Sequence, residues 1–186
     1  MPGGEIPQNH PLRLFFLLLT ENNFTRKLNW SDPFVTGYIA DLLIQFTHID
    51  RLYEIRNGSG KRVDTVAEML MEGDLMMGAK TIEREREVHR CIGDYTLFMT
   101  GIFPEYLKRM KRERMIEHAD FLIDYVKVGK KSYKRVAEFN YGRFKQWVPL
   151  YRKLSENFEV CIAGLGLIRK DLDHFKGWRT QRQILS

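Results

Sequence analysis

The sequence predicts an all-α protein, and three observations support this. Apolar residues recur at spacings of three and four along most of the chain, the period of a helix with one buried face. Helix start signals such as Asp32-Pro33 precede these stretches. The composition, with 44% hydrophobic and 29% charged residues, is that of a globular protein. We expect one domain over residues 1–186, a bundle of six or seven helices around a central buried helix, with flexible tails at 1–10 and 176–186.

The first 75 residues predict three helices and a hairpin. A helix from 11 to 28 begins after His10-Pro11 and is apolar nearly all round over its first two turns. A second helix runs from Pro33 to about residue 48, with an apolar stripe at helical spacing. An Asn-Gly turn signal between two short segments predicts a small β-hairpin near 51–63. Asp64 or Thr65 can cap a short helix over 66–71.

The segment 79–102 predicts the central helix of the bundle. Its second half is apolar on opposite sides, because Leu97 points away from the main apolar stripe. Such a helix must be surrounded, and Gly93 and Gly101 would let neighbouring helices approach it closely. We therefore expect one core in which five side chains are buried together: Ile92, Tyr95, Phe98, Met99 and Cys161.

The last third of the chain predicts two long helices. The first covers about 118–139, with Phe121, Tyr125 and Tyr133 directed inward. The second begins at Pro149 and carries an apolar face from Leu154 to Leu172. A polar tail follows from residue 176.

Several function classes find no support in the sequence. The two cysteines, Cys91 and Cys161, lie in apolar helical patterns and are expected to be buried free thiols. The chain contains no P-loop, no strand followed by GxGxxG, no GxSxG and no CxxC, so we expect no cofactor. The apolar run at 14–19 is too short to span a bilayer, and we expect a cytoplasmic protein without a membrane span.

The candidates for catalysis lie on the central helix. Glu85 and His89 share one ridge, and Asp94 lies about 140° around the helix from His89. A carboxylate and a histidine in a helical core can perform acid–base chemistry or bind a metal. The alternative is that His89 is hydrogen-bonded at a helix edge, and that Asp94 pairs with an arginine or caps a neighbouring helix. We expect no metal site, because no second histidine lies four residues from His89.

The second half of the chain is basic. Residues 1–107 carry 11 basic and 15 acidic side chains, a net of −4, whereas residues 108–186 carry 19 and 9, a net of +10. If these basic side chains form a continuous stripe, it could contact phosphates; otherwise they could be an ordinary solvated surface. The candidate nucleic-acid contacts are Lys108, Arg109, Lys111, Arg112, Lys127, Lys130, Lys131 and Lys134.

The sequence thus favours a non-enzymatic protein–protein interaction module, most simply a homodimer, because the chain is globular and carries no motif. One alternative is weak, sequence-independent nucleic-acid binding through the basic half. Another is an enzyme or metal binder centred on the central helix. A large apolar patch would favour the first, a continuous basic stripe the second, and a deep polar pocket at His89 the third.

Overall fold

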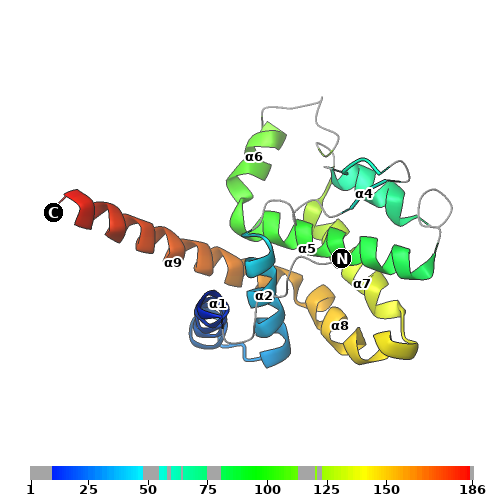
Figure 1. The fold of residues 1–186 in the computed structure, drawn as a ribbon, viewed down its shortest axis with the longest axis horizontal. Helices are drawn as coiled ribbons and strands as arrows, with labels where there is room; N and C mark the ends of the chain where they lie inside the picture. Colours follow the sequence, from blue (N-terminus) through cyan, green and yellow to red (C-terminus); the bar gives the residue numbers. More distant parts are fainter. Residues whose placement is uncertain are drawn as a thin grey trace.

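A computed structural model describes residues 10–47, 55–57, 60–63, 65–74, 81–112, 120 and 123–184, with side chains described as far as Phe175. The all-α prediction is confirmed (Figure 1). The described residues form eight α-helices, one more than the upper limit expected from the sequence. The elements are α1 (Pro11–Glu21), η1 (Asn22–Lys27, π-helical), α2 (Pro33–Gln45), α4 (Val66–Gly73), α5 (Ile82–Ile102), α6 (Pro104–Arg112), α7 (Tyr125–Glu138), η2 (Gly142–Trp147, a 3-10 helix), α8 (Val148–Glu156) and α9 (Phe158–Ile184).

Local capping chemistry sets where four of the helices begin. The Asp32 side chain accepts hydrogen bonds from two backbone N–H groups at the start of α2. Thr65, Thr81 and Asp124 each accept one such bond at the starts of α4, α5 and α7. Each cap satisfies an N–H group that has no partner within its own helix. The first turn of α7 therefore follows Asp124, and the expected start near residue 118 is wrong.

Two expected helices are interrupted in the structure. The first becomes π-helical at Asn22, where the Asn23 amide donates to the Leu19 carbonyl four residues earlier. The long C-terminal helix is divided at Asn157, whose amide donates to the Lys153 carbonyl. The backbone of α9 is then helical to Ile184, through residues for which the sequence predicted a tail.

The hairpin expected near 51–63 is not seen as a pair of strands. Arg56 and Arg62 form one isolated antiparallel bridge, and the Val63 N–H donates to the Ile55 carbonyl at 2.9 Å. No strand occurs among the described residues of this segment, and 51–54 and 58–59 lie outside them.

The helix α5 contacts α2, α4, α6, α7 and α9, and a separate apolar cluster lies on each of two sides of it. Phe98 and Cys161 belong to the larger cluster, whereas Ile92 and Tyr95 belong to the smaller one. The expectation of a single core holding all five side chains is therefore wrong. Half-buried Met99 packs against both clusters. The larger cluster is covered by α1, α2, α7, α8 and α9, and the smaller by α4, the start of α7, Ile55 and Val63.

Glycines allow the close approach of helices to α5. A Cβ atom on Gly93 would lie 2.5 Å from the ring of Tyr133 in α7, and one on Gly101 would lie 2.4 Å from Leu165 in α9. None of the helices in the described part of the chain is long and apolar enough to cross a membrane.

Candidate functional site

A pocket of about 460 Å³ opens between α4, α5 and α7, and its lining includes two of the three catalytic candidates. Its floor and walls combine charged, polar and apolar side chains from three helices. The lining residues are Leu70, Gly73 and Asp74 from α4 and its end, Glu85 and His89 from α5, and Val128, Lys131, Ser132 and Arg135 from α7.

The three helices are fixed by contacts at their first turns. Because α5 begins after Thr81, Glu85 and His89 fall one turn apart on the same face. The buried Asp120 carboxylate accepts from the N–H groups of Val66 and Ala67 at 2.9 Å, and from the Tyr125 hydroxyl at 2.8 Å. One side chain thus joins the start of α4 to the start of α7, the two helices that line the pocket together with α5.

Glu85 is a buried carboxylate with only one of its oxygens in use. The side chain is 4% exposed, and Oε1 accepts from the Arg135 guanidinium at 2.6 Å. Oε2 is buried and has no hydrogen-bond partner among the described residues. A buried carboxylate oxygen without a donor is costly, so this atom is a candidate contact for a ligand.

His89 lies beside Glu85 with its Nδ1 3.4 Å from the Ser132 hydroxyl. Burial lowers the pKa of His89, an effect opposed by the nearby Glu85 carboxylate and strengthened by Arg135. The imidazole is therefore neutral at pH 7, with one nitrogen that donates and one that accepts. A Cβ atom on Gly73 would lie 3.5 Å from Nε2, so the glycine leaves this side of the ring uncovered.

The arrangement of Ser132, His89 and Glu85 differs from a nucleophilic triad. A triad needs a carboxylate hydrogen-bonded to the base, but Glu85 Oε1 is bonded to Arg135 and Oε2 to nothing described. It also needs N–H donors for an oxyanion, whereas Ser132 lies inside α7, where N–H groups are bonded within the helix. The geometry suits binding of a polar molecule, with a neutral imidazole able to exchange a proton with it.

Asp94 lies outside this pocket, in a buried network between α2, α5 and α7. Its carboxylate accepts from the Tyr38 hydroxyl at 2.5 Å, the Tyr133 hydroxyl at 2.8 Å and Arg90 at 2.7 Å. Burial raises the pKa of Asp94, against the effect of Arg90 and the two hydroxyls, and the pKa of each tyrosine is raised well above 10.0. The structure thus brings Glu85 and His89 together in one pocket and places Asp94 outside it. Asp94 pairs with Arg90, as the alternative interpretation of the sequence expected.

The basic candidates do not form one stripe. Lys108, Arg109, Lys111 and Arg112 lie on α6, and the four lysines of the other set lie on α7. In Figure 1, α6 rises on one side of α5, while most of α7 runs along the other. Within the second set, Lys130 is paired with Glu159 at 2.7 Å, Lys131 lines the His89 pocket and Lys134 lines another pocket.

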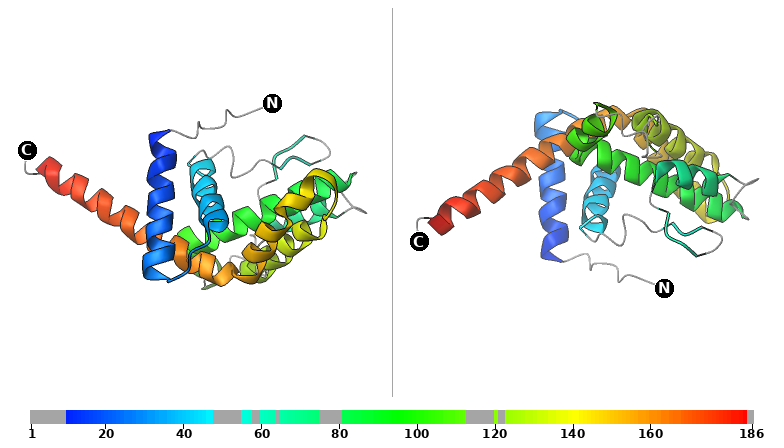
Figure 2. Two further views of the ribbon diagram at one scale, coloured as in Figure 1. Left: turned by 90° about the horizontal axis from the view of Figure 1, so that it is seen from below. Right: turned by 90° about the horizontal axis from the view of Figure 1, so that it is seen from above.

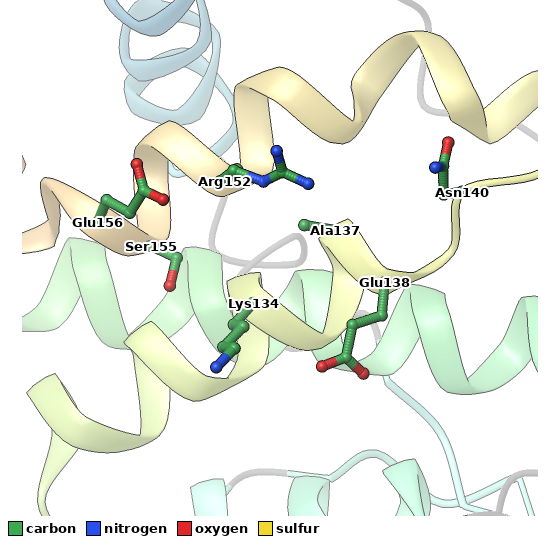
Figure 3. Close-up of a pocket in the computed structure, with 7 residues that line it drawn as sticks. All are labelled: Lys134, Ala137, Glu138, Asn140, Arg152, Ser155 and Glu156. Atoms are coloured by element: carbon green, nitrogen blue, oxygen red, sulfur yellow. The ribbon is translucent and has the colours of Figure 1, made fainter.

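That other pocket, of about 500 Å³, lies between α7 and α8 (Figure 3). Arg152 reaches from α8 towards Ala137, while Lys134 and Glu138 extend from α7 away from α8. The Ser155 hydroxyl donates to the Lys130 carbonyl at 2.8 Å. Among its described lining residues no buried polar atom lacks a partner. This pocket is larger, but it has no counterpart of the unbonded Glu85 Oε2 atom in the His89 pocket.

The sequence did not indicate Ser132 as a site residue, and it placed Lys131 and Arg135 in a possible phosphate-binding surface instead. One signal was available, since Ser132 is a polar residue at a buried position of α7, next to Tyr133.

Within the part of the chain that the structure describes, no group of three or more histidine, cysteine, aspartate or glutamate side chains is placed to hold a metal ion. No protein-family model, no curated protein and no solved structure matches the chain.

Proposed function

We propose that the chain binds a small polar molecule with no net charge, such as a zwitterion, in the His89 pocket. The observation that carries the proposal is the Oε2 atom of Glu85, a residue of the pocket lining: this atom is buried and has no donor among the described residues. Of the three function classes that the sequence suggests, this develops the one centred on α5.

The charges of the lining define the class of ligand. Glu85 and Asp74 are balanced by Lys131 and Arg135, and His89 is neutral. A ligand with a net charge would therefore leave an uncompensated charge in a partly buried site. A ligand with one donating group can satisfy Glu85 Oε2, and a carboxylate or hydroxyl on the same ligand can accept from Lys131.

The apolar part of the pocket limits what the rest of the ligand can be. Leu70 contributes an aliphatic side chain from α4 and Val128 one from α7, and Gly73 leaves room beside the imidazole. We therefore expect a compact molecule with a short aliphatic body, and free amino acids are the simplest probes of that chemistry.

The test is a thermal-shift screen of the full chain against individual amino acids, with neutral polyols and simple amines as comparison classes. A ligand at about 100 times its Kd stabilises the folded state by about 2.7 kcal/mol, which raises Tm by roughly 5–10 °C for a chain of this length. Glu85→Gln, which removes the charge but keeps the shape, should abolish the shift.

Glu138→Gln is the matched control. Glu138 is the other carboxylate bonded to Arg135, at 2.6 Å, but it does not line the His89 pocket. This variant should respond to the ligand as the wild type does. Equal shifts in wild type and Glu85→Gln, or no shift with any of the three probe classes, would show that the pocket is not the binding site.

A further inference from the structure

The connection between α7 and α8 presents aromatic and basic side chains to solvent. It covers residues 139–147 and includes the 3-10 helix η2. Tyr141 is 44% exposed and Trp147 is 47% exposed, and Arg143 and Lys145 are exposed between them. Figures 1 and 2 show this connection at the opposite end of the molecule from the end of α9. We call Tyr141, Arg143, Phe144, Lys145 and Trp147 the tip surface.

The three rings of the tip surface form one ridge. In a 3-10 helix, residues three apart in the sequence lie directly above one another, so Phe144 and Trp147 share a face of η2. Tyr141 immediately precedes η2 and continues the ridge, because its ring lies edge-on to that of Phe144 with 5.7 Å between the centroids. The ridge thus ends on each side in a half-exposed ring on which a flat ligand can stack.

The tip surface is positively charged and has no acidic neighbour in the sequence. Residues 139–155 contain four basic side chains and no acidic one. Of the four, Lys153 pairs with the capping carboxylate of α2, whereas Arg143, Lys145 and Arg152 form no ion pair with a described residue. A polyanion would therefore be attracted to this end of the molecule.

We propose that the tip surface binds single-stranded nucleic acid, with bases stacked on Tyr141 and Trp147 and phosphates in contact with Arg143 and Lys145. Rings and cations alternate along the segment, and stacking on aromatic side chains beside a basic surface is how single strands are bound without sequence preference. A duplex fits less well, because neighbouring bases already cover its base faces. The site is separate from the basic residues of α6 and α7 that the sequence indicated.

An anionic membrane is the other partner for exposed aromatic and basic side chains, but the centre of the ridge argues against it. A segment that lies in a bilayer presents a continuous apolar face. Here the guanidinium groups of Arg86 and Arg143 lie 4.4 and 5.1 Å from the centroid of the Phe144 ring. Arg86 is 8% exposed and makes no hydrogen bond with a described residue, so its charge stays against the ridge. Residues 139–147 also contain no aliphatic side chain that could enter the acyl region.

The test is fluorescence anisotropy of the full chain with a labelled oligothymidine of about 12 nucleotides, alone and annealed to its complement. The single strand should bind more tightly than the duplex. Tyr141→Ala and Trp147→Ala should each raise the Kd for the single strand at least about 5-fold, and Trp147→Phe, which keeps a ring, should recover most of the affinity. Arg143→Ala combined with Lys145→Ala should flatten the log–log salt slope by about 1.4, since each phosphate contact contributes about 0.7 on a single strand.

Two controls remove the same kinds of group elsewhere. Phe34→Ala deletes a ring that is 75% exposed on α2, and Lys108→Ala combined with Lys111→Ala deletes two exposed cations of α6. The first should bind the single strand as the wild type does, the second should keep the wild-type salt slope, and circular dichroism checks that every variant is folded.

Four results overturn the proposal: duplex binding as tight as single-strand binding, an unchanged Kd in Trp147→Ala, a salt slope that falls in the α6 variant instead, or no binding to the strand at about 50 mM salt. Vesicles of phosphatidylcholine and phosphatidylserine are titrated in parallel. Binding to the vesicles with none to the strand assigns the tip surface to membranes, which also overturns it.

Discussion

The substitution Gly164→Ala tests how tightly α9 is packed on the N-terminal helices. A Cβ atom at this position would lie 2.1 Å from Cε2 of Phe24 and 2.2 Å from Cζ, far inside van der Waals contact. Phe24 is fully buried in η1, so its ring cannot move aside without displacing other core side chains. Overpacking of this kind costs about 1–3 kcal/mol, whereas alanine in place of glycine within a helix stabilises by about 1 kcal/mol.

Gly166→Ala supplies the matched control in the same helix. The nearest atom to a Cβ there is the Gly101 carbonyl oxygen at 4.0 Å, so the variant gains the helix propensity without a clash. Because the propensity term cancels, the difference between the two variants isolates the packing penalty, which we expect to be about 1–3 kcal/mol. Urea unfolding followed by far-ultraviolet circular dichroism measures it. Equal stability of the two variants would show that α9 does not approach Phe24 as closely as the structure places it.

Three further predictions concern the charged groups. Asp94→Ala should lower the free energy of unfolding by about 3–5 kcal/mol in urea, because it removes the acceptor of two buried hydroxyls and one of the two carboxylate partners of half-buried Arg90, which keeps Glu87; Glu85→Gln should change it by less than about 1 kcal/mol. Burial lowers the pKa of His89, so the unfolded chain binds more protons and stability falls as the pH drops through about 6.5; this pH dependence should be weaker in His89→Asn. Duplex DNA binding, titrated at two salt concentrations, should be weak and insensitive to sequence, with a log–log salt slope no steeper than about −4, because the basic residues are divided between α6 and α7.

The parts of the fold that depend on neighbouring residues in the chain were predictable. The helix starts at Pro33 and after Thr65 follow from caps and prolines that can be read in the sequence. The division at Asn157 could not be predicted in this way, because neither glycine nor proline marks it; in the structure the Asn157 amide donates to the Lys153 carbonyl four residues earlier. The two-sided apolar pattern of α5 indicated burial, but periodicity does not show which helices cover each side, and so the two clusters were expected to be one.

The same limit applies to the His89 pocket. Glu85 and His89 lie one turn apart on a single helix, so their shared face could be predicted from spacing alone. Ser132 and Arg135 reach the pocket from 43 and 50 residues away in the sequence, and only the packing of α7 against α5 brings them there. Lys131 was assigned to a phosphate-binding surface because its charge is visible in the sequence and its neighbours in space are not.

Two buried carboxylates on α5 show how the structure separates a supporting role from a binding role. Asp94 has donors on both oxygens, from Tyr38, Tyr133 and Arg90, and the donors come from three helices. Glu85 is buried to a similar degree but, among the residues that the structure describes, has donors on Oε1 alone. A fully bonded carboxylate stabilises the fold that surrounds it, whereas a half-bonded one costs stability that a ligand can recover. Asp94 should therefore matter for stability whether or not a ligand is present, and Glu85 should matter chiefly when one is bound.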